Sequence, residues 1–148
     1  MRMWMMMARV AVVVVGLTAG GWAADPAVGP SADGPRVQIA LLLDTSNSMD
    51  GLIMQAKTQL WRVINEVAGA SRNGRRPRLE VALYEYGNNR LPAADGYIRQ
   101  VLPLTDDLDR VSEELFKLTT NGGDEYCGRV IKAAVDRLAW SASNDDLK

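Results

Sequence analysis

The chain has 148 residues, of which 47% are hydrophobic and 24% charged, and this composition is typical of one globular domain. Its formal charge of −1 provides no basic field that would attract nucleic acid, so we expect no nucleic-acid partner. The sequence has no histidine, which excludes Ser-His-Asp and Cys-His catalysis and imidazole zinc sites, and its single cysteine, Cys127, cannot form an internal disulfide.

The N-terminal residues 1–23 have the plan of a secretory signal peptide. Arg2 and Arg9 precede an apolar stretch that ends in small residues, and cleavage is expected after Ala23. An uncleaved N-terminal anchor is the alternative, and it would be the chain's only contact with a membrane. Residues 24–35 are rich in Pro, Gly, Ser and Ala, which predicts a flexible leader. We therefore expect a periplasmic or secreted protein.

The first structured segment is predicted to be a strand over residues 36–44. This run is apolar without polar alternation, which is typical of a strand buried on both faces in a parallel sheet. In residues 51–69 apolar side chains recur three and four apart, which predicts an amphipathic helix with Ser48 or Asp50 as its cap. Residues 79–87 alternate and predict a second strand.

The remaining elements are a strand and two helices. Residues 96–104 predict a third strand, and Pro103 suits a position at the edge of the sheet. The patterns of 106–118 and 124–140 predict helices. Because a strand feeds a helix and then another strand, we expect an α/β layered sheet flanked by helices, formed by one domain over residues 36–148.

The sequence LLLDTSNSMDG, residues 41–51, places polar side chains where the first strand ends. Ligands of open α/β sheets bind at the carboxyl ends of the strands, and the turn into the following helix lets Asp44, Ser46 and Ser48 converge. Oxygen-only ligands suit hard cations, so the pattern predicts a divalent-metal site, with Mg²⁺ expected first and Mn²⁺ or Ca²⁺ as alternatives. Water and an external carboxylate could complete the coordination.

This segment resembles the metal-ion-dependent adhesion motif, Asp-x-Ser-x-Ser, of von Willebrand factor A (VWA) domains. The order of elements through residue 140 is also similar to that family. Where VWA domains supply a threonine ligand after a glycine pair, this chain has Asp124 after Gly122 and Gly123. The resemblance makes Asp124 a fourth candidate ligand.

The resemblance implies a Rossmann-like VWA sheet and metal-ion-dependent binding of a protein partner through an acidic side chain, with no catalysis. In such a fold a fourth strand lies beside the first, so we interpret the sequence as the N-terminal part of a larger protein, truncated before that strand. The strand over 36–44 is then predicted to present an unpaired apolar edge, prone to aggregation.

Several alternatives stay open. Asp44 and the serines could only shape a turn and cap a helix, which would make the chain a scaffold domain with a degenerate site. Asp124 could likewise only cap the last helix. The segment LLLDTS also resembles the active-site turn of aspartic proteases, although Ser46 stands at the glycine position and a helical pattern follows at once. Cys127 is expected to be a buried thiol rather than a ligand.

Overall fold

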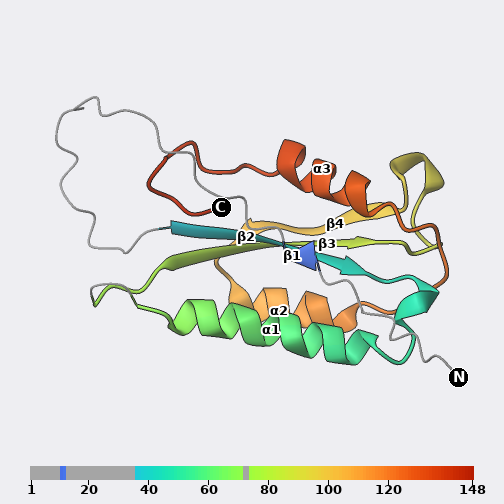
Figure 1. The fold of residues 1–148 in the computed structure, drawn as a ribbon, viewed down its shortest axis with the longest axis horizontal. Coiled ribbons are helices and arrows are strands. Elements are labelled where there is room, and N and C mark those ends of the chain that lie inside the picture. Colours follow the sequence, from blue (N-terminus) through green and yellow to red (C-terminus); the bar gives the residue numbers. More distant parts are fainter. Residues whose placement is uncertain (1–10, 13–35, 72–73) are drawn as a thin grey trace, which may run out of the picture.

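The computed structural model describes residues 11–12, 36–71 and 74–148 (Figure 1). Within them the chain forms four strands and three α-helices. In chain order these are β1 (Ala11–Val12), β2 (Arg36–Asp44), α1 (Ile53–Gly69), β3 (Arg78–Tyr86), β4 (Ile98–Thr105), α2 (Leu108–Lys117) and α3 (Cys127–Arg137). The signal peptide and leader predicted for residues 1–35 lie outside the described residues, except for Ala11 and Val12.

The strands form one mixed sheet in the order β1-β2-β3-β4. Strands β2 and β3 are parallel and in continuous register, from Arg36 opposite Arg78 to Asp44 opposite Tyr86. Strand β4 is antiparallel to β3 and lies at the edge, where the exposed Pro103 is tolerated. Helices α1 and α2 cover one face of the sheet and α3 covers the other (Figure 1). The predicted α/β class is therefore confirmed.

The continuous apolar run of β2 follows from this three-layer arrangement. Because side chains alternate along a strand, Leu41 and Leu43 pack into the core with α1 and α2. Their neighbours Ala40 and Leu42 pack into a second core with α3 on the opposite face. Both faces of β2 are thus covered by helices, which leaves no position for the polar alternation seen in strands with one solvated face.

The outer edge of β2 is paired at two places by described residues. Ala11 and Val12 pair antiparallel with Leu42 and Leu41. Near the other end of the strand, Leu147 forms a parallel bridge with Val37. In the chain of 148 residues the prediction that this edge is unpaired is therefore wrong for these positions, because two segments distant in sequence both satisfy its backbone groups. Cleavage after Ala23 would remove Ala11 and Val12 and leave only the bridge to Leu147.

Each of the three helices begins two or three residues later than the sequence predicted. A short 3-10 helix, Asn47–Met49, separates β2 from α1, and the capping position of α1 is Leu52, with no side-chain cap from Ser48 or Asp50. Helix α3 spans 127–137 rather than 124–140, since the chain on its N-terminal side is drawn into contacts with the loops that follow β2 and β3. No α-helix among the described residues is long and apolar enough to cross a membrane.

Candidate metal centre

Three loops meet at the end of the sheet where β2 and β3 terminate. They are residues 45–52, residues 87–92 and the segment 118–126 that precedes α3. The backbone N–H of Asn121 donates to the Thr45 carbonyl at 2.9 Å, and that of Asn89 donates to the Gly122 carbonyl at 2.7 Å. These bonds fasten the third loop to both of the others.

Two glycines allow the loops to approach this closely. A Cβ atom on Gly123 would lie 2.2 Å from the carbonyl oxygen of Gly87, so the two backbones touch with no room for a side chain. Gly87 itself has φ +80°, and a Cβ there would lie 2.9 Å from Asp44 Oδ1 and 3.5 Å from Glu125 Cγ. Glycine is therefore required at both positions to bring the carboxylates of Asp44 and Glu125 to one place.

The predicted residues Asp44, Ser46 and Ser48 do converge. Asp44 Oδ1 accepts a hydrogen bond of 2.8 Å from the Ser46 backbone N–H. The hydroxyl oxygens of Ser46 and Ser48 lie 2.9 Å apart. Both hydroxyls donate to Glu125 Oε1, at 2.7 Å from Ser46 and 3.0 Å from Ser48. The cluster thus contains two carboxylates and two hydroxyls at the mouth of the β2–α1 turn.

The carboxylate on the serines belongs to Glu125, whereas the sequence predicted Asp124. The side chain of Asp124 is exposed, and its carboxylate accepts a long hydrogen bond of 3.4 Å from the Tyr126 hydroxyl. It does not cap α3 either, because the capping residue is Tyr126 and no side-chain cap bond is formed. The glycine pair and the two adjacent acids marked this loop in the sequence, but no local signal distinguishes which acid turns inward.

The cluster places negative charge in a partly desolvated setting. Burial raises the pKa of Asp44 above its ordinary value, the hydrogen bonds from Ser46 oppose this rise, and the nearby Glu125 carboxylate adds to it. Burial likewise raises the pKa of Tyr86, whose side chain lies close to Asp44. The two carboxylates repel each other, and a cation between them would relieve that repulsion.

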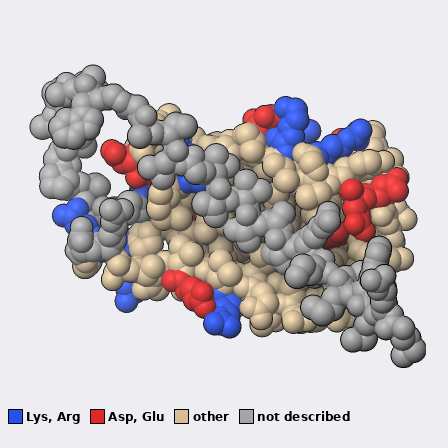
Figure 2. All heavy atoms as spheres, viewed as in Figure 1, with Lys and Arg blue, Asp and Glu red and all other residues tan. Residues whose placement is uncertain are grey.

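The donor set suits a hard divalent cation, because all four candidate ligands present oxygen atoms. No group of three or more His, Cys, Asp or Glu side chains is placed to hold a metal ion in the described part of the chain. The two carboxylates and two hydroxyls therefore carry little negative charge for a metal site, and water or an external ligand would have to complete the coordination of a cation. Figure 2 shows acidic side chains gathered at the end of the molecule where β2 ends in Figure 1.

An aromatic stack lies next to the cluster. The rings of Tyr97 and Tyr126 are nearly parallel, with centroids 6.4 Å apart. The guanidinium of Arg129 lies 4.6 Å from the Tyr126 ring centroid, within the range of a cation–π interaction. Tyr97 has φ +55°, a left-handed conformation that costs free energy in a tyrosine. The stack packs the segment after Gly96 against the start of α3, directly beside Glu125.

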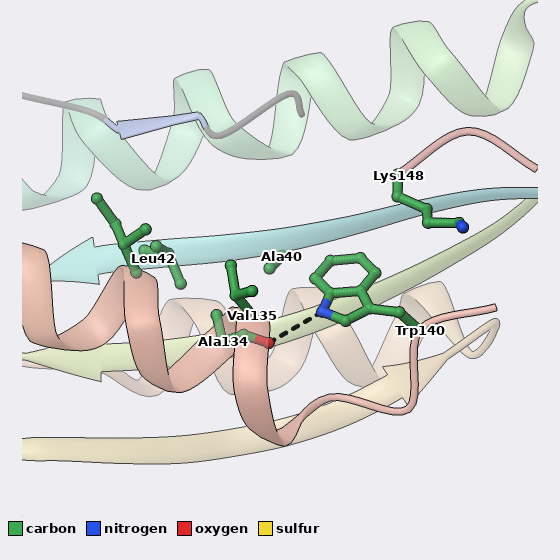
Figure 3. Close-up of a pocket in the computed structure, with 7 residues that line it drawn as sticks. Ala40, Leu42, Ala134, Val135, Trp140 and Lys148 are labelled. Atoms are coloured by element: carbon green, nitrogen blue, oxygen red, sulfur yellow. Dashed lines mark hydrogen bonds between the residues drawn. The ribbon is translucent and has the colours of Figure 1, made fainter. Parts of the chain in front are cut away.

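A cavity away from the loop cluster has a different character. An apolar cavity of about 220 Å³ lies between β2 and α3, under the Trp140 indole, which donates to the Ala134 carbonyl at 3.0 Å (Figure 3). Its lining includes Ala40, Leu42, Ala134, Val135, Trp140 and Lys148. Such a lining offers packing but almost no polar chemistry, so the loop cluster is the better candidate for a functional site.

Comparison with known proteins establishes the fold alone. No family model and no curated protein matches this sequence. Among solved structures, the chain is similar to the three N-terminal domains of the type V pili tip protein Mfa5 from Porphyromonas gingivalis and to an uncharacterized protein from Alicyclobacillus acidocaldarius subsp. acidocaldarius. Each match has a TM-score of 0.50 and 18% identity over 68% of this chain. The matches span 17% and 40% of those longer chains.

Proposed function

We propose that this chain is a VWA-like, metal-ion-dependent protein-binding module of an exported protein. The observation that carries the proposal is the cluster formed where a buried strand passes into its helix. There Asp44 accepts from the Ser46 backbone N–H, and the hydroxyls of Ser46 and Ser48 both donate to the Glu125 carboxylate. A helix and two backbone-linked loops support these side chains, so the cluster is built into the fold.

The proposed cation is Mg²⁺, with Mn²⁺ and Ca²⁺ as alternatives. Asp44 would supply a charged oxygen and Ser46 and Ser48 would supply neutral ones, while water fills the remaining positions. Such a cation retains part of its positive charge, which an acidic side chain of a protein partner would neutralise. Ser46 is almost fully buried and Asp44 half-buried, which excludes part of the competing water and strengthens charge interactions there.

Isothermal titration of the intact chain with Mg²⁺ and Mn²⁺ tests this proposal. We expect saturable heat from the wild type and a loss of at least about tenfold in affinity for Asp44→Ala, since even residues behind the ligands cost about 10–100-fold in metal affinity. Asp106→Ala is the matched control, because Asp106 is exposed beside the start of α2. Equal affinities for wild type and Asp44→Ala would reject the proposed site.

A scaffold domain with a degenerate site is the second candidate. It is favoured by the hydrogen bonds among Ser46, Ser48 and Glu125, which satisfy these polar groups without a cation. Titrations without heat in either ion would support this candidate. In that case Asp44 serves to shape the turn, through its bond to the Ser46 backbone.

The partner is proposed to be a protein that presents a carboxylate, and the chain is proposed to bind it without catalysing a reaction. The signal-peptide pattern of residues 1–23 supports a periplasmic or secreted location, with membrane contact only through an uncleaved signal. The small net charge of −1 supports the absence of a nucleic-acid partner.

A further inference from the structure

The carboxylate of Glu125 lies on the side of the cluster that carries the hydroxyls of Ser46 and Ser48. Its Oε1 atom accepts hydrogen bonds from the Ser46 hydroxyl at 2.7 Å and from the Ser48 hydroxyl at 3.0 Å, so one carboxylate oxygen serves both serines. Glu125 is nevertheless an exposed residue, two positions before α3 begins. Its carboxylate therefore lies on the solvent side of the cluster, between the serines and anything that approaches them.

The backbone that carries Glu125 is fixed, while its carboxylate stands at the end of a flexible side chain. The bonds from Asn121 to Thr45 and from Asn89 to Gly122 hold the preceding loop. Both hydrogen bonds would have to break before that loop could withdraw as a whole. Rotation of the Glu125 side chain is consequently the simplest motion that would uncover the serines.

We propose that Glu125 is an internal, displaceable carboxylate ligand of the cation, which holds the position that a partner's acidic side chain must take. This inference rests on the proposed function of the site. A carboxylate attached to the same loop has an effective concentration on the order of millimolar or more, so a free carboxylate competes poorly with it. The partner must therefore combine its acidic side chain with further contacts in order to displace Glu125.

The test uses Mn²⁺ as the probe ion, because its paramagnetism reports bound water through water-proton relaxation. Affinity is measured by titration calorimetry and hydration by relaxation for the wild type, Glu125→Ala and Glu125→Gln. Asp124→Ala is the matched control. It removes the same charge at the neighbouring position, and the Asp124 side chain is exposed and bonds to Tyr126 instead of to the serines. Circular dichroism and the urea midpoint establish that each variant is folded.

We expect Glu125→Ala and Glu125→Gln to bind Mn²⁺ at least about tenfold more weakly, and Asp124→Ala to bind almost as the wild type does. Bound Mn²⁺ in Glu125→Ala should carry about one additional water, which replaces the lost ligand. Acetate, used as a model of a partner's carboxylate, should displace that water at lower concentration in Glu125→Ala than in the wild type. Glu125→Gln keeps an acceptor for the serines, so its weaker binding would separate loss of a ligand from loss of folding.

Other outcomes would overturn the inference in distinguishable ways. If Asp44→Ala abolishes Mn²⁺ binding while Glu125→Ala keeps wild-type affinity and hydration, Glu125 is no ligand and the proposed function still stands. If Glu125→Ala and Asp124→Ala weaken binding equally, general charge and not a specific ligand is responsible. If the wild type binds no Mn²⁺, the inference and the proposed function both fail.

Discussion

Gly123→Ala should destabilise the protein far more than a surface glycine substitution. The added Cβ would lie 2.2 Å from the Gly87 carbonyl oxygen and 3.1 Å from the Asn89 backbone nitrogen. Both neighbours are backbone atoms, so no side-chain rotation can relieve the overlap. Ordinary van der Waals contact begins at 3.4 Å, and the two loops must therefore separate by about 1.2 Å.

That separation sets the size of the effect. It would stretch the 2.7 Å hydrogen bond from Asn89 to the Gly122 carbonyl beyond a useful length. A lost hydrogen bond costs about 0.5–1.5 kcal/mol and overpacking about 1–3 kcal/mol, so we expect the free energy of unfolding to fall by about 2–4 kcal/mol. Because the same loop carries Glu125, cation affinity should fall as well.

Urea denaturation followed by circular dichroism measures this change, with Gly128→Ala as the matched control. A Cβ on Gly128 meets nothing within 4 Å, and the residue lies in the first turn of α3. Alanine is the better helix former, so Gly128→Ala should be neutral or stabilise by up to about 1 kcal/mol. A Gly123→Ala protein as stable as the wild type would refute the argument that the loops touch at this point.

Two further predictions concern the scaffold around the site. Asp107 caps α2 by accepting from the Arg110 backbone N–H at 3.0 Å, so Asp107→Ala should cost about 1 kcal/mol in thermal or urea unfolding, whereas Asp106→Ala should cost little. Burial raises the folded-state pKa of Glu85 above its ordinary value, and the nearby Arg99 opposes this rise. Because the folded protein holds this proton more tightly than the unfolded chain does, its stability falls as pH rises from the unfolded-state pKa through the folded-state pKa. The difference in melting temperature between Glu85→Gln and wild type should therefore shift in favour of Glu85→Gln as pH is raised from 4 toward neutrality, and a difference that is flat with pH would contradict this assignment.

The order and kind of the elements were determined by local sequence patterns. The apolar run of residues 36–44 predicted β2 with its observed bounds, and the helical period of 51–69 predicted α1 to within two residues of its start. These predictions succeed because the spacing of apolar residues directly reflects which stripe of a helix, or which faces of a strand, are buried. The convergence of Asp44, Ser46 and Ser48 was also predictable locally, but for a different reason: all three lie within one turn at the end of a strand.

Only the tertiary structure decided which carboxylate joins the serines. Asp124 and Glu125 are adjacent acids after the same glycine pair, and nothing in their local sequence separates them. The choice depends on a backbone contact between Gly123 and Gly87, which are 36 residues apart in the sequence numbering. The pairing of Ala11–Val12 and of Leu147 along the β2 edge is likewise a contact between distant segments. Periodicity reports which face of an element is buried, but the partner that buries it is set by how loops and edges meet in three dimensions.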